Sequence, residues 1–168
     1  QYLDSVYNNK PVLGGWFGKN TTGNPEVILA AKPDMILSYG NMDEASLTFA
    51  DRIQNQLHLP AVIVNSDINR MDTAFRFIGE LIGEKGRSDS LANYCRLALD
   101  EVKAVVSLIP EGIRVKVYYA EGLKGLETDP KGSMHSEVLE LAGGVNVAEV
   151  PISNGFGRSA VTFEQLLL

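Results

Sequence analysis

The sequence predicts an α/β protein with two Rossmann-like parallel-sheet lobes, both incomplete, that are joined by a single long helix. Short apolar runs typical of buried strands alternate with segments of helical periodicity, as in parallel sheets with crossover helices. From residue 88 to residue 109, apolar residues also recur every three to four positions, over roughly 22 residues or about 33 Å of helix. We therefore expect an N-terminal lobe at residues 1–85, a linker helix at 86–109 and a C-terminal lobe at 110–168.

The N-terminal lobe begins with a region that shows no regular pattern. Residues 1–23 are rich in Asn, Gly and Thr and are predicted to form a long loop. Asn24 can accept an N–H of a first helical turn, and the proline and glutamate that follow also suit that turn, so a helix is expected to about Ala31. The apolar run at residues 35–37 then predicts a strand buried on both faces.

The same order of helix and strand repeats in the next segment. Helical spacing of apolar residues at 47–57 precedes a proline and a second apolar run at 61–64, which predicts another strand. A further helix is expected at 68–82, and Gly83 ends it. The repetition is what favours a parallel sheet in this lobe.

The C-terminal lobe is predicted from a second series of elements. Apolar and polar residues alternate at 115–119, which indicates a strand. Ser133 can cap a helix that reaches Ala142, and residues 145–148 are expected to form a short strand. Thr162 can cap a last helix, and because the sequence stops on apolar residues within it, we interpret the chain as truncated.

Composition excludes several classes of function. The chain has 168 residues, 45% of them hydrophobic, which is enough apolar material for a buried core. Its formal net charge of −6 and the absence of any Lys/Arg run argue against a nucleic-acid partner. Its apolar stretches are too short to span a bilayer. A single cysteine, Cys95, can form neither an internal disulfide nor a CxxC site.

The sequence carries no persuasive catalytic motif. It lacks the GxGxxG of dinucleotide-binding proteins, the P-loop and the GxSxG nucleophile elbow. The segment from His135 to Glu137 has the HxE of zinc deaminases, but the PCxxC that they also need is absent. The other histidine, His58, is expected in the other lobe, away from His135. We therefore expect no catalytic residues, no cofactor and no metal bound directly by side chains.

Several segments, taken in order, resemble a known family. Residues 24–37 (NPEVILAAKPDMIL) are similar to an N-lobe segment of the class III substrate-binding proteins of ABC importers, which serve siderophores, haem and vitamin B12. Later blocks resemble that family in the same order, at residues 59–64, 78–83, 137–148 and 162–167. The resemblance implies two lobes joined by one rigid helix, with the ligand between them.

The resemblance also implies a docking role for two glutamates. The family carries a glutamate on each lobe that pairs with arginines of the membrane permease, and by motif these are Glu26 and Glu164. Each is expected at the second position of a helix. A glutamate there also stabilises the helix dipole by about 0.3–1 kcal/mol without any partner, so a purely structural role is the alternative.

Candidate ligand contacts come from loops that follow predicted strands, where ligands of open α/β sheets bind. The aromatic residues among them can lie against a chelate or macrocycle, or can instead anchor their own loops. Backbone N–H groups near the helix start at Ser133 suit an anion, and His135 either contacts a metal chelate or is an ordinary surface histidine. The candidates are Trp16, Phe17, Tyr39, Gly40, Asn41, Ser133, His135, Phe156 and Arg158.

These observations together predict a solute receptor without chemistry of its own. We expect it to bind an iron chelate of the siderophore kind in an inter-lobe cleft and to deliver it to the transmembrane permease subunits. Haem, cobalamin and molybdate-type oxyanions remain alternative ligands, and a Rossmann-like enzyme fragment or a sensor of the same fold are alternative classes. The expected location is periplasmic or extracytoplasmic, as a tethered lipoprotein in an organism without an outer membrane. Open sheet edges also predict self-association.

Overall fold

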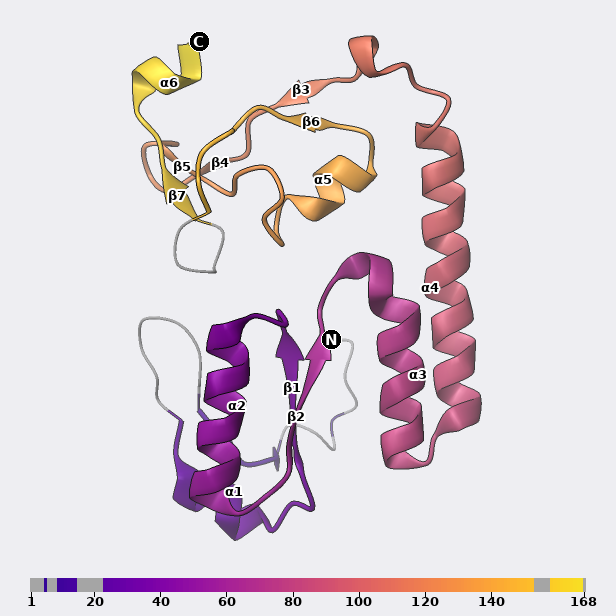
Figure 1. Cartoon of the computed structure of the whole chain (residues 1–168), viewed down its shortest axis with the longest axis vertical. Helices are drawn as coiled ribbons and strands as arrows, with labels where there is room; N and C mark the ends of the chain where they lie inside the picture. Colours follow the sequence, from indigo (N-terminus) through magenta and orange to yellow (C-terminus); the bar gives the residue numbers. More distant parts are fainter. Residues whose placement is uncertain (1–4, 6–8, 15–22, 153–157, 168) are drawn as a thin grey trace. The chain divides into compact units, whose positions relative to one another are not determined.

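The computed structural model describes residues 5, 9–14, 23–152 and 158–167 (Figure 1). By internal contacts it divides into two units, Gln1–Asn65 and Ser66–Leu168. Helices alternate with short strands in both units, so the predicted α/β class is confirmed. The lobe boundaries at residues 85 and 110 stay a prediction.

The first unit is a repeated helix and strand. Its elements are α1 (Pro25–Ala31), β1 (Ile36–Gly40), α2 (Glu44–Leu57) and β2 (Ala61–Asn65). The two strands are parallel, with Ile36 opposite Ala61 and Gly40 opposite Asn65, as the repeated pattern predicts. Parallel strands require a crossover connection, and α2 provides it.

Side chains and prolines set the ends of these helices. The Oδ1 atom of Asn24 accepts the N–H of Glu26 at 2.9 Å, which confirms the predicted start of α1. Asp43 caps α2 in the same way, by accepting the N–H of Ser46 at 2.8 Å. Lys32 and His58 end the two helices in the left-handed region, and a proline follows each of these positions closely.

The core of the first unit lies between its helices and one face of its strands. Ile28 of α1 packs with Ile53 and Leu57 of α2, and Ile36 of β1 contacts this cluster. On the opposite face of β1, the side chain of Leu37 is 45% exposed. The prediction that this strand is buried on both faces is therefore wrong, because only one face of the pleated strand meets the cluster.

The second unit opens with a helical hairpin. A short 3-10 turn, η2 (Ile68–Arg70), leads into α3 (Met71–Ile82), and α4 (Lys85–Val106) follows. Figure 1 shows α3 and α4 side by side. The long helix is confirmed as one continuous element of 22 residues, three residues earlier in the chain than predicted. Gly83, with φ 76°, ends α3 and lets the chain reverse at once.

Small residues allow α3 and α4 to approach closely. Ala74 and Gly79 of α3 are buried, as are Ser88 and Ala92 of α4, and Ala92 has no exposed surface. A Cβ atom added to Gly79 would lie 1.8 Å from the Oγ and 2.3 Å from the Cβ of Ser88. The absence of a side chain at Gly79 is thus a condition of this contact.

The rest of the second unit consists of short elements. β3 and β6 form a parallel pair, whereas β4, β5 and β7 form an antiparallel sheet that the sequence pattern did not predict. The predicted strand at residues 115–119 is represented by β3 alone, since the chain then bends into β4. The elements are η3 (Glu111–Ile113), β3 (Lys116–Val117), β4 (Ala120–Glu121), β5 (Glu127–Thr128), α5 (Glu137–Leu141), β6 (Val145–Asn146), β7 (Ser159–Ala160) and α6 (Phe163–Leu167).

None of the helices in the described part of the chain combines the length and the apolar character that crossing a membrane demands.

Replacing Gly79 by Ala should destabilise the helical hairpin, because the new methyl group would overlap the side chain of Ser88. We expect G79A to lower the free energy of unfolding by about 1–3 kcal/mol in urea denaturation. The matched control is G86A in α4, where an added Cβ atom meets nothing within 4 Å. This control should be neutral or stabilising by up to about 1 kcal/mol; equal losses in both variants would contradict the close contact.

Candidate functional site

The segment between β5 and α5 is the most deeply buried polar part of the described structure. Asp129, Ser133 and Ser136 lie in it with 1%, 2% and 1% of their surface exposed. Burial of such groups is unfavourable unless each one finds a hydrogen-bond partner. The conformation of residues 129–136, which we call the 129–136 segment, is therefore set by its polar contacts.

Asn146 of β6 ties this segment to the parallel strand pair. Its Nδ2 atom donates to the backbone oxygen of Asp129 at 2.9 Å, and its Oδ1 accepts the N–H of Ala148 at 3.0 Å. The N–H of Lys131 in turn donates to the oxygen of Ala148 at 3.1 Å. The segment is thus hydrogen bonded along its length to the end of β6.

Two serine side chains form hydrogen bonds inside this segment. Ser136 Oγ lies 2.9 Å from the backbone oxygen of Pro130, and Ser133 Oγ lies 3.2 Å from Ser136 Oγ. The Ser133 side chain, predicted to contact a ligand, therefore contributes to the internal network of the turn. Its role toward a ligand stays a prediction.

His135 projects from this rigid turn. Its Nδ1 atom lies 3.0 Å from Oδ2 of Asp129, whose side chain is 1% exposed, while the imidazole is 54% exposed. A carboxylate at Nδ1 favours the tautomer with the proton on that nitrogen, which leaves the lone pair of Nε2 for an outside group. A buried carboxylate that orients an exposed imidazole is also the arrangement found behind metal-binding histidines.

A second set of charges lies next to Asp129. Arg158 forms an ion pair with Glu127, and its Nε atom is 3.9 Å from Oε2 of Glu121. Burial, followed by the charge of Asp129 and a hydrogen bond with it, raises the pKa of Glu121. The Arg158 guanidinium, predicted to neutralise an anionic chelate, is half exposed and already compensated by glutamates.

Gly122 is required where these charges meet. Its φ of +72° belongs to the left-handed region, and an added Cβ atom would lie 2.8 Å from Oε1 of Glu127. The tight turn between β4 and β5 therefore brings Glu121 and Glu127 onto the same edge, opposite each other in the antiparallel register.

In the first unit, the predicted contacts lie at the carboxyl end of β1. Tyr39 is 57% exposed, Gly40 is the last residue of the strand, and Asn41 follows it. Because β1 and β2 are parallel, their carboxyl ends share one edge, where α/β proteins bind ligands.

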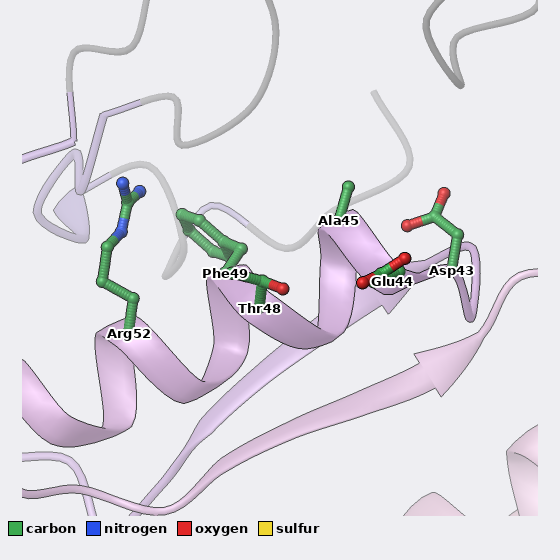
Figure 2. Close-up of a pocket in the computed structure, with 6 residues that line it drawn as sticks. All are labelled: Asp43, Glu44, Ala45, Thr48, Phe49 and Arg52. Carbon is green, nitrogen blue, oxygen red and sulfur yellow. The ribbon is translucent and has the colours of Figure 1, made fainter.

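A hollow of about 720 Å³ lies along the start of α2, the helix that follows β1 in the sequence. Figure 2 shows Phe49 and Arg52 rising from the same side of the helix, and the guanidinium lies 5.3 Å from the centre of the Phe49 ring. The sequence analysis missed this surface, although residues spaced by four along α2 would have indicated a common face. The lining residues are Asp43, Glu44, Ala45, Thr48, Phe49 and Arg52.

The remaining predicted residues are placed as follows. Trp16, Phe17 and Phe156 lie outside the described residues. Glu26 and Glu164 are exposed second residues of α1 and α6, as predicted. At α6, Thr162 Oγ1 accepts the N–H of Gln165 at 3.3 Å and the Gln165 side chain accepts the N–H of Thr162 at 2.8 Å, which is a capping box.

Within the described ranges, no three His, Cys, Asp or Glu side chains come together in a group able to hold a metal ion.

Neither a family model nor a curated protein matches the chain, but solved structures do. The chain is 40% identical to an ABC transporter solute binding protein from Sulfurospirillum deleyianum DSM 6946, with a TM-score of 0.83 over 98% of this chain and 50% of that one. It is 24% identical to the periplasmic vitamin B12 binding protein BtuF of Vibrio cholerae, with a TM-score of 0.65 over 87% of this chain and 54% of that one. It is 18% identical to S. aureus IsdE, solved with heme, with a TM-score of 0.71 over 99% of this chain and 60% of that one.

These likenesses define the class of protein: the chain has the fold of the two-lobe periplasmic binding proteins. What it shares with the B12 and heme proteins is the fold alone. Its structural neighbours are ABC-transporter solute-binding proteins of the siderophore, haem and vitamin B12 class, and the predicted resemblance is confirmed. They are transport proteins and not enzymes. The chain spans between 50% and 60% of the length of the three structures just named.

Truncating Asn146 should loosen the 129–136 segment, because the backbone oxygen of Asp129 and the N–H of Ala148 would both lose a buried partner. We expect N146A to lower the free energy of unfolding by about 1–3 kcal/mol in chemical denaturation. N55A, at an exposed position in the last turn of α2, is the matched control and should change stability by less than about 0.5 kcal/mol. A neutral N146A would show that the segment does not depend on this amide.

Proposed function

We propose that the protein containing this chain is the solute receptor of an ABC importer and that it captures a metal complex of the iron-chelate, haem or vitamin B12 kind. The observation that supports this most strongly is the 40% identity to an ABC transporter solute binding protein over 98% of the chain. The location proposed with it is periplasmic or extracytoplasmic, with a lipid tether where the organism has no outer membrane.

The side chains of the 129–136 segment favour a metal complex as the ligand. His135 offers Nε2 from a rigid, half-exposed position, while Asp129 behind it supplies negative charge. The carboxyl group of Glu121 is next to Asp129. The carboxylate of Asp129 behind His135 disfavours a free oxyanion such as molybdate and favours a complex whose metal carries positive charge. An iron chelate is our first choice, with haem and cobalamin as alternatives.

The other proposed contacts come from both units. Tyr39, Gly40 and Asn41 stand at the carboxyl end of β1, where an exposed aromatic ring suits a chelate. In the second unit we propose His135 and Arg158, together with the backbone near Ser133. Trp16, Phe17 and Phe156 complete the proposed set. Self-association through open sheet edges also remains a proposal.

Glu26 and Glu164 are proposed to bind permease arginines. Both carboxylates stand on exposed first turns, and among the described residues neither takes part in an ion pair. A bidentate arginine contact at such a site is geometrically specific.

A ligand screen tests the receptor proposal. Ferric siderophores, haem, cobalamin and molybdate are each added to the full-length protein, and binding is measured by thermal shift and calorimetry. We expect one metal complex to raise the Tm, and H135A to weaken its binding by about tenfold or more, equivalent to about 1.4 kcal/mol.

The control for His135 is His58, an exposed histidine that ends α2 with φ 56°. H58N keeps a residue that tolerates this left-handed conformation and should leave the ligand affinity unchanged. If none of the four ligands binds, or if the protein turns over a substrate, the receptor proposal is wrong.

Removing the two exposed glutamate charges should uncouple capture from transport. The double variant E26Q and E164Q is expected to bind its ligand with unchanged affinity but to support uptake by the permease at least tenfold less well, because each lost charge-assisted contact weakens docking by about 1.5–3 kcal/mol. E101Q, an exposed position on α4, is the control. Undiminished uptake by the double variant would exclude these residues from docking.

A further inference from the structure

The loop that carries His135 is held by backbone hydrogen bonds as well as by side chains. The N–H of Ser133 donates to the oxygen of Pro130 at 3.0 Å, and the N–H of Ser136 donates to the oxygen of Ser133 at 3.2 Å. Two successive turns therefore run from Pro130 to Ser136, and His135 lies within the second. The contact of 3.0 Å between Nδ1 of His135 and Oδ2 of Asp129 spans both turns, so the imidazole is fixed through its backbone and through its ring.

The carboxylate of Asp129 is directed at this imidazole. The aspartate side chain is 1% exposed, and its Oδ2 atom contacts Nδ1 of His135. Arg158, the arginine of the neighbouring strand end, pairs with Glu121 and Glu127 instead. A buried carboxylate needs a donor, and the N–H at Nδ1 supplies it here.

This contact decides which nitrogen of His135 faces outward. The two nitrogens of an imidazole ring point in diverging directions, so Nε2 points away from Asp129. Because the ring is 54% exposed and the aspartate is buried, the exposed side of the ring is the one that carries Nε2. A carboxylate at Nδ1 also makes Nε2 a stronger electron-pair donor. One lone pair at Nε2 can form one coordinate bond to a metal.

We propose that Nε2 of His135 bonds directly to the metal of the captured complex, and that Asp129 is the positioning residue for this bond. In this step an exchangeable ligand such as water leaves the metal, Nε2 takes its place, and the proton stays on Nδ1 against Asp129. The ligand class is therefore a metal complex with an exchangeable coordination position. The identity of this cargo rests on the proposed function, whereas the state of the imidazole is measured without any cargo.

The first test is the tautomer of His135 in the full-length protein without ligand. Long-range proton–nitrogen NMR spectra report which ring nitrogen carries the proton, and H135A identifies the signals of this residue. We expect the proton on Nδ1 at about pH 8.5, where ordinary histidines carry no charge. A histidine side chain in water prefers the proton on Nε2, so finding it there in the wild type would overturn the positioning role.

The second test uses a pair of metal probes. Aquapentaammineruthenium(II) holds one exchangeable water among inert ammonia ligands, whereas hexaammineruthenium(II) holds ammonia alone. Each probe is incubated with the full-length protein, and adducts are located by mass spectrometry of peptides. We expect the aqua complex to label His135 and the hexaammine complex to leave it unlabelled. Labelling of the exposed His58 without labelling of His135 would refute the direct bond.

The variant D129A separates positioning from structure. We expect it to move the proton of His135 to Nε2 and to slow ruthenium labelling there by about tenfold or more, as the loss of such a partner does at metal sites. Labelling of His58 should not change. S136A is the matched control, because it removes an equally buried hydroxyl that bonds Pro130 in the same segment but keeps the carboxylate. It should retain the wild-type tautomer and labelling rate; equal slowing in both variants would overturn the inference.

The outcomes also separate this inference from the receptor function. If no metal complex of the ligand screen binds, while the tautomer and the labelling are as expected, the receptor proposal fails and the positioning of His135 by Asp129 stands. If a complex binds equally tightly to the wild type and to D129A, the receptor proposal stands and the direct bond is refuted.

Discussion

The second unit depends on the hydrogen bonding of a buried polar segment. Residues 129–136 place an aspartate and two serines where almost no solvent reaches them. Asn146 donates to the backbone oxygen of Asp129, and Ser136 Oγ donates to the backbone oxygen of Pro130, so these bonds stabilise the conformation of the segment. This requirement sets the direction of His135, because its Nδ1 atom is held by the same buried Asp129.

Two pairs of acidic side chains lie next to the 129–136 segment of this unit. Burial and the neighbouring Asp129 raise the pKa of Glu121, and burial and the neighbouring Asp67 raise the pKa of Glu137. In both pairs the pKa of the glutamate is raised, and in both the first cause is burial. The net charge of −6 thus includes acids whose ionisation the fold opposes.

The helical hairpin shows a different way to hold elements together. Gly79 and Ala92 let α3 and α4 approach closely, so this packing depends on shape. An ion pair between Arg76 of α3 and Asp89 of α4, at 3.6 Å, adds to it. The B12 and heme proteins have a similar fold at 24% and 18% identity. For ligand choice we propose instead a dependence on a few side chains at loops, such as Tyr39 and His135.

The sequence by itself determined the α/β class, the caps at Asn24 and Thr162, and the single 22-residue helix, because these follow from local periodicity and from side chains that bond their own backbone. It also carried the family resemblance. Only the tertiary structure decided that Ser133 turns inward, that Asp129 holds His135, that β4, β5 and β7 form an antiparallel sheet, and that Asn69 contacts both Asp67 and Glu137. These contacts join residues whose environment depends on distant burial, and no local pattern encodes which buried partner a polar side chain will find.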